Sequence, residues 1–290
     1  MLKKIQYNVC VLVLVLGASI PVSLHADSGA VPMIVTTIKP LAIIAKSAVG
    51  DAAEVEYLLP ANQSPHSLSL PISALKKITE ADLIVWIGRD FETRSAKTMA
   101  KLSPSKKITV ADEIAKLVAG GDLRGDNSQD NSYSIDPHLW LDPTYGNSIA
   151  AEIQTRLGLP IKKIIAEDNI QLLKASVMFS EGQNYLSHHA AYQHFIRALE
   201  LPAGMSIRNA QGHAKGVQSQ LQLRKTMAKA NFSCIFIEPQ YQGKDAAIIA
   251  AQFDLPLVAL DPQGLSQPLN NSAYEEFMAG LVAQFKACFQ

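Results

Sequence analysis

The stretch MIVTTIKPLAIIAKSAVGD, residues 33–51, decides the fold class of this chain. It opens with a short run rich in β-branched residues, which is typical of a strand. Apolar residues then recur at the helical spacing i, i+3, i+4 and i+7: Leu41, Ile44, Ala45 and Ala48. Pro40 stands near the start of this second segment and Gly50 just past its end, as helices prefer. The stretch therefore predicts a strand followed at once by a helix, the unit of a parallel α/β sheet.

The same alternation extends in both directions along the chain. Further strands are expected at 53–60, 82–88, 106–112, 234–239 and 256–262, and further helices at 71–81, 190–199 and 216–230. Between the two βα series, residues 147–182 have a largely helical pattern, which Gly-Leu-Pro at 158–160 is expected to interrupt. A Gly, Asp, Asn and Ser-rich segment at 119–134 predicts an exposed, mobile loop.

We therefore expect two α/β lobes and divide the chain into four parts. Residues 1–26 precede the first lobe, which covers 27–146. A connecting helical region at 147–182 leads to the second lobe at 183–290. The segments 78–88 and 228–238 occupy similar places in the two halves, which hints at an internal repeat.

The N-terminal segment has the layout of a secretory signal peptide. Lys3 and Lys4 precede an apolar run over residues 9–20, and the small residue Ala26 closes the segment, so cleavage is expected after Ala26. The apolar run is shorter than the ~20 residues that a membrane-spanning helix needs, which disfavours an anchor. Cys10 lies too early to be the lipidated first residue of a lipoprotein. We expect export to the periplasm as a soluble protein.

Composition excludes several classes of partner and predicts one crosslink. Apolar residues make up 48% of the 290 residues, while Lys+Arg and Asp+Glu both number 26. Such a chain can bury a large core, and its balance of charge gives no reason to expect nucleic acid or an anionic membrane as partner. Past the signal peptide only Cys234 and Cys288 remain. An even pair in an exported protein predicts a disulfide, worth about 4 kcal/mol for a loop of this length, with two buried thiols as the alternative.

Six histidines follow the signal peptide, but their spacing matches no compact metal motif such as HExxH. No GxSxG, P-loop or GxGxxG occurs either. The positions of the histidines and carboxylates relative to the predicted strands are more informative, because ligands of open α/β sheets bind outside the carboxyl ends of the strands. His66 and His189 follow apolar segments there, and Glu238 and Asp261 end two predicted strands. His138 stands beside Leu-Trp, and that position alone is more typical of a hydrogen-bonded, semi-buried histidine than of a metal ligand.

Seven segments, in order, resemble one protein family: the extracytoplasmic solute-binding proteins that deliver zinc or manganese to ABC importers, most closely the zinc-binding ZnuA type. The segments extend from about Met33 to Gly264. Their occurrence in this order is far more specific than any single segment would be. The segments are TTIKPLAIIAKSAVGD, VEYLLPANQSPHSLSL, EADLIVWIGRDFE, DPHLWLDP, SHHAAYQHF, IFIEPQ and LDPQG.

The resemblance implies two α/β lobes joined by a long connecting helix, with one metal ion in the cleft between them. The family's three metal histidines fall on His66, His138 and His189, and its carboxylate after the last strand falls on Asp261. Three imidazoles with Asp261 or water as the fourth ligand suit tetrahedral Zn²⁺, whereas Mn²⁺ prefers more carboxylates.

The resemblance and the local sequence also suggest supporting roles. Glu238 and Asp136 are candidates for the shell behind the ligands, and Asp142 lies in the same segment. Cys234 and Cys288 match the positions of a disulfide in the ZnuA type. The chain departs from its relatives at Ala190, where the family usually has Asp, at Pro65, which leaves no glutamate before His66, and in the histidine-free loop at 119–134.

The function implied is capture of Zn²⁺ as transported ligand and delivery to an inner-membrane ABC transporter permease for high-affinity uptake. The protein is expected to be a monomer and not an enzyme, with neither nucleic acid nor any other substrate. Three alternatives remain open. One is a manganese- or iron-binding member of the family, another a secreted zinc hydrolase with Glu238 as its acid or base, and the third a member that has lost metal binding.

Overall fold

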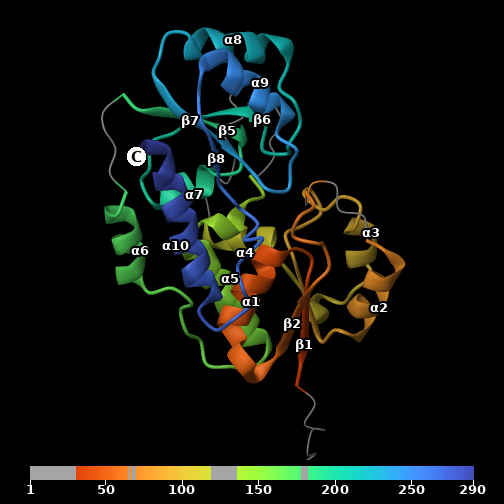
Figure 1. Cartoon of the computed structure of the whole chain (residues 1–290). Helices are drawn as coiled ribbons and strands as arrows, with labels where there is room; N and C mark the ends of the chain where they lie inside the picture. Colours follow the sequence, from red (N-terminus) through yellow and green to blue (C-terminus); the bar gives the residue numbers. More distant parts are fainter. Residues whose placement is uncertain (1–30, 65, 67–69, 119–135, 178–181) are drawn as a thin grey trace, which may run out of the picture. The chain divides into compact units, whose positions relative to one another are not determined.

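The structure is a computed structural model, and it describes residues 31–64, 66, 70–118, 136–177 and 182–290 (Figure 1). The expected signal peptide and the expected loop at 119–134 lie outside these described residues. Residues 31–290 form one contact unit, so the two sheets described below belong to a single body.

The first sheet has four parallel strands in the order β2-β1-β3-β4, as the opening stretch predicts. Its strands are β1 (Met33–Thr36), β2 (Glu54–Tyr57), β3 (Leu83–Trp86) and β4 (Lys107–Thr109). Its helices are α1 (Lys39–Val49), α2 (Ile72–Glu80), α3 (Ala96–Met99) and α4 (Val110–Leu117), with short 3₁₀ turns η1 (Gly50–Ala52) and η3 (Pro104–Lys106). The strands expected in this half are all present.

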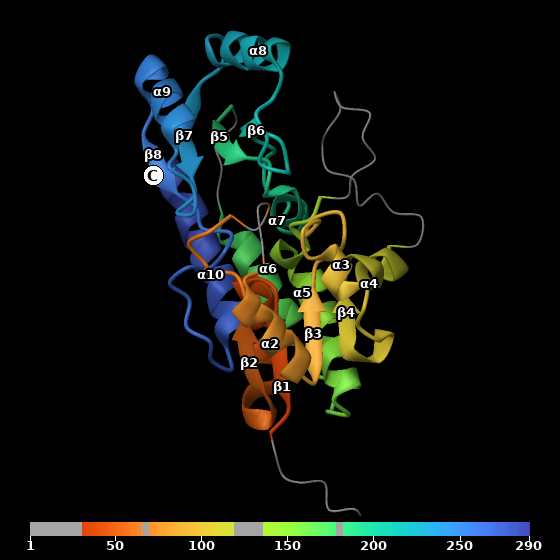
Figure 2. The ribbon, with the colours of Figure 1, turned by 90° about the vertical axis from the view of Figure 1, so that its right-hand side faces the viewer.

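The second sheet repeats this plan with the order β6-β5-β7-β8, again parallel throughout. Its strands are β5 (Asn184–His189), β6 (Met205–Arg208), β7 (Phe232–Ile237) and β8 (Leu257–Ala259). Its helices are α7 (Gln193–Ala198), α8 (Val217–Met227) and α9 (Lys244–Phe253). Figure 2 shows the two sheets from the side, in orange to yellow and in green to blue. Two α/β lobes are therefore confirmed.

The two sheets agree in detail. In β1 the Thr36 hydroxyl donates to the carbonyl two residues ahead and to that of Glu56 in β2. In β5 the Ser187 hydroxyl makes the same two bonds, to the carbonyls of His189 and Met205. The hinted internal repeat therefore has a structural counterpart, and it fixes which positions of the two sheets correspond.

The connecting region consists of two helices, α5 (Pro143–Arg156) and α6 (Glu167–Ala175). Asp142 caps α5 by accepting the backbone N–H of Thr144 at 2.8 Å, and proline occupies the first turn. Helix α5 ends where Gly158 adopts φ of +65°, which a residue with a side chain rarely adopts. The interruption expected at Gly-Leu-Pro is confirmed, and the connection is a broken helix, not a single long one.

The last helix, α10 (Ala273–Lys286), packs against α1, and the 3₁₀ turn η5 (Ala287–Phe289) follows it. In Figure 1 this dark blue helix runs beside α1 and α5, although the chain reaches it from the second sheet. The Tyr274 hydroxyl donates to the carbonyl of Trp140 at 2.9 Å. A Cβ at Gly146 would lie 2.3 Å from the Tyr274 ring, so only glycine allows this close packing of α5 and α10.

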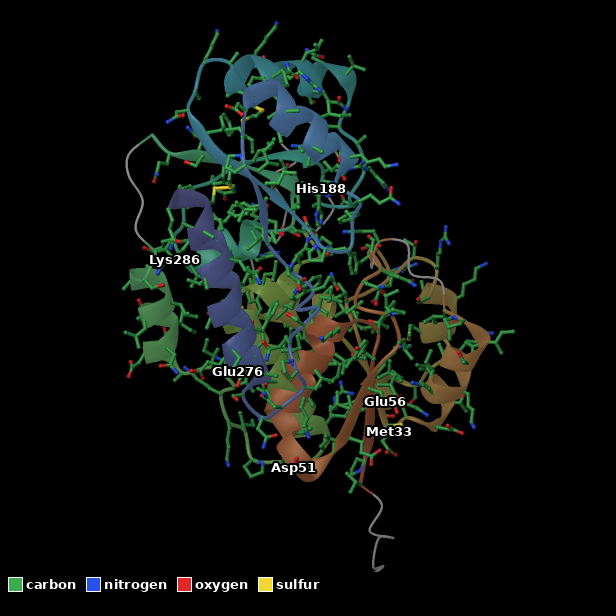
Figure 3. All side chains as sticks on the ribbon, viewed as in Figure 1. Met33, Asp51, Glu56, His188, Glu276 and Lys286 are labelled. Atoms are coloured by element: carbon green, nitrogen blue, oxygen red, sulfur yellow. A yellow bond between two sulfur atoms is a disulfide. The ribbon has the colours of Figure 1, made fainter. Side chains whose placement is uncertain are left out.

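The predicted disulfide is present between Cys234 in β7 and Cys288 in η5, and it is drawn in yellow in Figure 3. Both cysteines are buried. The bond ties the chain's last turn to β7, one of the two middle strands of the second sheet, while α10 itself packs against α1.

Candidate metal centre

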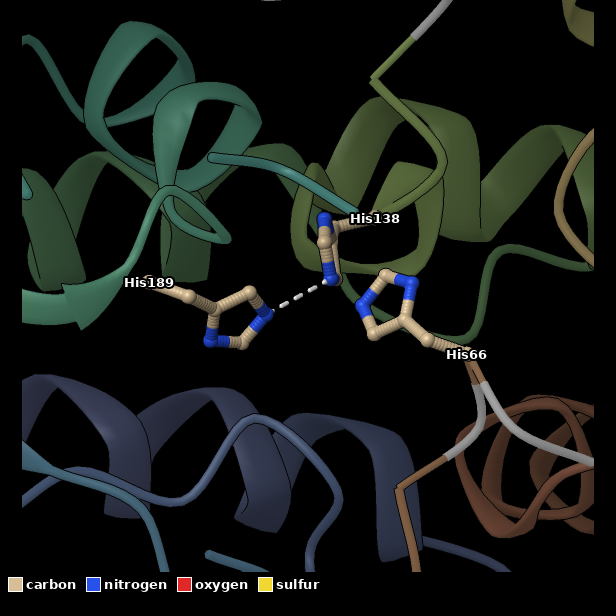
Figure 4. Close-up of side chains that lie close together, drawn as sticks. All are labelled: His66, His138 and His189. Carbon is tan, nitrogen blue, oxygen red and sulfur yellow. Dashed lines mark hydrogen bonds between the residues drawn. The ribbon is translucent and has the colours of Figure 1, made fainter. Parts of the chain in front are cut away.

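Three histidines expected as metal ligands meet at one point. His66 lies in the segment after β2, His138 immediately precedes the 3₁₀ turn η4 (Leu139–Leu141), and His189 is the last residue of β5. One ring nitrogen of each lies within 4.8 Å of the other two. Figure 4 shows the three rings turned toward one another from separate parts of the chain. The sequence separates these residues widely, and only the two-sheet fold brings them together.

His138 is held by its immediate neighbours. Its Nδ1 lies 2.7 Å from Oδ1 of Asp136, and the same oxygen accepts the backbone N–H of His138 at 3.1 Å. Trp140 is fully buried beside the ring and donates its indole N–H to the carbonyl of Pro262 at 2.8 Å. Trp140 therefore packs beside His138 and anchors the backbone here, and Nε2 of His138 faces the other two histidines.

His189 is held in the same way from the second sheet. Its Nδ1 is hydrogen-bonded to Oε1 of Glu238, the residue that follows β7. The other carboxylate oxygen of Glu238 accepts from the Gln240 side-chain amide at 2.7 Å. Glu238 and Asp136, expected behind the ligands, therefore each contact one of the three histidines, an arrangement common at metal sites.

These bonds determine which nitrogens are free to bind a cation. Because Oδ1 of Asp136 already accepts an N–H, and a carboxylate of Glu238 only accepts, Nδ1 of each histidine carries the proton. Each Nε2 then presents a lone pair, yet Nε2 of His138 and Nε2 of His189 lie only 3.2 Å apart. Two ligands at 2.0–2.1 Å from a tetrahedral Zn²⁺ are separated by about 3.3 Å. The pair therefore has the spacing of two zinc ligands.

Burial favours the neutral form of His138 and His66. Burial is the main cause that lowers the pKa of His138 well below its ordinary value. Electrostatic repulsion from the neighbouring His189 and His194 lowers it further. Burial also raises the pKa of the Asp136 carboxyl. For His66, burial and the neighbouring histidines lower the pKa to about 2. Neutral imidazoles are the form that binds metal, so these two rings do not need to lose a proton first.

His66 differs from the other two because, within the part of the chain that the structure describes, no carboxylate holds its ring. Its edge packs on Phe91, with ring centroids 4.8 Å apart, and its Nε2 is buried without a hydrogen-bond partner among the described residues. A buried polar atom without a partner is costly. A cation shared with His138 and His189 would provide that partner, which is a second indication that the three rings fit a metal ion.

Asp261 is not among the groups of described residues whose ligand atoms converge. Its Oδ1 accepts the backbone N–H of Gln263 at 2.9 Å, and its Oδ2 accepts that of Leu265. Lys39 lies close enough to favour the charged carboxylate, although burial raises the pKa of Asp261 overall. In this conformation Asp261 shapes the turn after β8, and it would have to leave a backbone partner to bind a metal.

Sequence reasoning missed three residues around the centre. His194 is 1% exposed and bonds to the carbonyl of Asp136 at 3.0 Å. Tyr241 packs its ring on His188 and reaches the Ser64 hydroxyl at 3.0 Å. His188 also belongs to a second convergent group with His189 and Glu238. Only the position of Tyr241, just after Glu-Pro-Gln, gave any signal in the sequence.

Comparison with known proteins places the chain in a family. The model of the ZnuA family, described as zinc-uptake complex component A, periplasmic, matches residues 34–288. The chain belongs to this family. ZnuA of Haemophilus ducreyi, a high-affinity zinc uptake system protein, is 26% identical over 287 residues, covering 88% of this chain and 92% of that protein.

Two further comparisons agree with this membership. The high-affinity zinc uptake system protein ZnuA of Yersinia pestis is 25% identical over 290 residues, covering 89% of this chain and 91% of that protein. A crystal structure of ZnuA superposes with a TM-score of 0.70 at 21% identity, over 90% of this chain and all of that one. The two-lobed fold is therefore that of the ZnuA type. Within the described residues, no helix is long and apolar enough to cross a membrane.

Proposed function

We propose that this protein binds Zn²⁺ in the periplasm and delivers it to an ABC transporter in the inner membrane. The observation that carries the proposal is the convergence of His66, His138 and His189, two of them held by carboxylates so that Nε2 faces the centre. Family membership in zinc uptake supports the ion and the role. Export would follow from the expected signal peptide.

The donor set favours zinc over manganese. Three neutral imidazoles with one open position match tetrahedral Zn²⁺, whereas Mn²⁺ prefers carboxylate, carbonyl and water oxygens. Asp261 remains our candidate for the fourth ligand if it exchanges a backbone N–H for the metal, with water as the alternative. Ligands drawn from both sheets also suit a carrier, because separation of the sheets removes two of the three histidines from the third.

A hydrolase finds less support at this site. The one residue expected to act as acid or base, Glu238, is hydrogen-bonded through both oxygens, to His189 and Gln240. It positions a ligand and is not directed at a substrate. We therefore propose a binding protein that takes up one ion per molecule at this centre and has the permease as its partner.

Metal analysis of the purified mature protein, followed by competition between Zn²⁺ and Mn²⁺, tests the proposal. We expect one tightly bound Zn²⁺ at this centre that Mn²⁺ in excess does not displace. The His138→Ala variant is the control, because it removes one ligand and should lose most of the affinity. Tight binding of Mn²⁺ in preference to Zn²⁺, or an unchanged affinity in the variant, would contradict the proposal.

A further inference from the structure

Behind the three-histidine centre lies a second group of potential ligands, drawn from the second sheet alone. One ring nitrogen of His188, one of His189 and one carboxylate oxygen of Glu238 all lie within 4.8 Å of one another. All three residues are buried. Neither His66 nor His138 belongs to this group, so it does not depend on the first sheet.

His188 has the features of a ligand in its own right. Its side chain is 2% exposed, and its Nδ1 is buried without a hydrogen-bond partner among the described residues. Its Nε2 lies 3.2 Å from Oδ1 of Asp245, which also accepts the backbone N–H of Ala246. Asp245 is therefore an acceptor, Nε2 carries the proton, and Nδ1 presents a lone pair. The same carboxylate–histidine pattern holds His138 and His189.

One member of this group, His188, borders an open hollow at the surface. His188 lines this hollow of about 420 Å³ together with Tyr241, Asp245 and Arg208. Arg208 holds Asp245 in place through a 2.7 Å bond from Nε to Oδ2. Asp245, which pairs with Nε2 of His188, lines this hollow, whereas Nδ1 of His188 is buried on the side of His189 and Glu238. Figure 3 labels His188 within the second half of the chain.

From this geometry we propose that His188, His189 and Glu238 form a second Zn²⁺ position, which holds the ion when His66 and His138 no longer do. The proposal rests on the zinc-binding function proposed above. The two positions alternate because they share His189, which binds through Nε2 in the first and through Nδ1 in the second. When the ion moves, the Nδ1 proton of His189 passes to Nε2 through solvent, so no proton is gained or lost.

The second position has two imidazoles and one carboxylate, and it forgoes the bond by which Glu238 orients His189. Since it loses both a third imidazole and an orienting bond, we expect binding more than ~100-fold weaker than at the first position. Loss of such an orienting bond reduces metal affinity about 10–100-fold. A weaker position on one lobe would keep the ion bound after the lobes separate and yet release it readily.

The test uses the mature protein, with Co²⁺ as a spectroscopic probe and Zn²⁺ titrated against a chromophoric chelator. The His66→Ala/His138→Ala variant removes the first position and is expected to retain one weaker Zn²⁺ site. Adding His188→Asn should abolish that residual site, whereas adding His213→Asn removes an equally polar ring and should leave it. Circular dichroism and the intact disulfide confirm folding, and His188→Gln repeats the test if His188→Asn does not fold.

The outcomes separate the two proposals. If the parent protein binds no Zn²⁺, the proposed function itself is wrong. If the parent binds Zn²⁺ but the double variant binds none, the second position is wrong and the function stands. Residual binding that survives both His188→Asn and His188→Gln would also overturn the second position, because it would place the weaker ion elsewhere.

Discussion

The two sheets share one topology but differ in what stands at their centre. In each, the chain turns from one side of the sheet to the other between the two middle strands, and ligands of such sheets bind at this switch point. Register aligns Thr36 with Ser187 and Val85 with Phe236. The second sheet therefore has His189 and Glu238 where the first sheet has Ile38 and Ile87.

At the switch point of the first sheet lie buried apolar side chains and one buried carboxyl group. Ile38 is fully buried, and Glu92 accepts the backbone N–H groups of Ile87 and Gly88 through Oε2. Its metal histidines come instead from segments outside the sheet, His66 after β2 and His138 before η4. One sheet thus presents a candidate histidine together with the carboxylate that holds it, and the other half contributes its two candidate histidines on connecting segments. A carrier that must release its ion gains from this asymmetry.

Removing a ligand should give the largest effect and rank the histidines. His189→Ala and His138→Ala each delete a ring held by a carboxylate, and we expect Zn²⁺ affinity to fall more than ~100-fold, beyond the loss seen for residues behind the ligands. His66→Ala deletes the ring without such support and should cost less. Isothermal titration with a competing chelator measures all three. Equal losses would show that carboxylate support does not distinguish the ligands.

Removing the supporting carboxylates should give an intermediate effect. Glu238→Gln and Asp136→Asn keep the shape of each side chain but let it donate, which permits the wrong tautomer of His189 or His138. We expect affinity to fall about 10–100-fold in each. Glu92→Gln is the matched control, since Glu92 is equally buried but belongs to the other switch point. An equal loss of Zn²⁺ affinity in Glu92→Gln would contradict the difference between the sheets.

Glu92 should instead affect stability as a function of pH. Burial raises the pKa of its carboxyl to about 7, against hydrogen bonds from Thr37, Gly88 and Ile87 that lower it. Because the folded state holds the proton more tightly than the unfolded chain, the stabilisation is complete below the unfolded pKa and is lost as pH rises through about 7. The free energy of unfolding of the parent should then decline by at most ~1.4 kcal/mol per pH unit.

The Glu92→Gln variant should lack this decline, because it has no carboxyl to ionise. Urea denaturation of the metal-free parent and variant at pH 5, 6 and 7 compares the slopes. A variant whose stability falls with pH as steeply as the parent's would show that another group is responsible.

The smallest effect is expected from one hydrogen bond among the contacts between the two halves. The Tyr241 hydroxyl and the Ser64 hydroxyl lie 3.0 Å apart, which joins the segment carrying His66 to the second lobe. Tyr241→Phe removes this bond, worth about 1 kcal/mol, so Zn²⁺ should dissociate several-fold faster. Stopped-flow transfer to a chelator measures the rate. His189→Ala cannot replace this variant, because it removes a ligand. Tyr241→Phe leaves the three histidines in place, so a change in the dissociation rate reports on the Tyr241–Ser64 contact alone.

Much of the fold could be predicted from local pattern. The opening stretch gave β1 and α1 because β-branched residues, helical spacing, Pro40 and Gly50 all agree. Strand β6 was not predicted, since Met205–Arg208 is short and has no apolar run. Helix α10 was also missed, although Tyr274, Phe277, Met278 and Leu281 carry a clear helical spacing.

The site was harder to predict, because its residues meet only through the fold. His66, His138 and His189 came from resemblance and strand-end position, and the structure brings them together. Asp261 was expected beside them, but the backbone N–H groups of the turn after β8 take its oxygens. His188 was not predicted as a ligand, since neighbours on a strand point to opposite faces. At the end of β5, however, both rings reach Glu238.

The most direct test of the central claim is the anomalous scattering of a zinc-soaked crystal, measured on both sides of the zinc absorption edge. A single strong peak within ~2.0–2.1 Å of the Nε2 atoms of His138 and His189, with His66 as the third ligand, is the expected result. A peak remote from these rings, or coordination through carboxylates without them, would contradict the assignment of the three histidines as the zinc ligands.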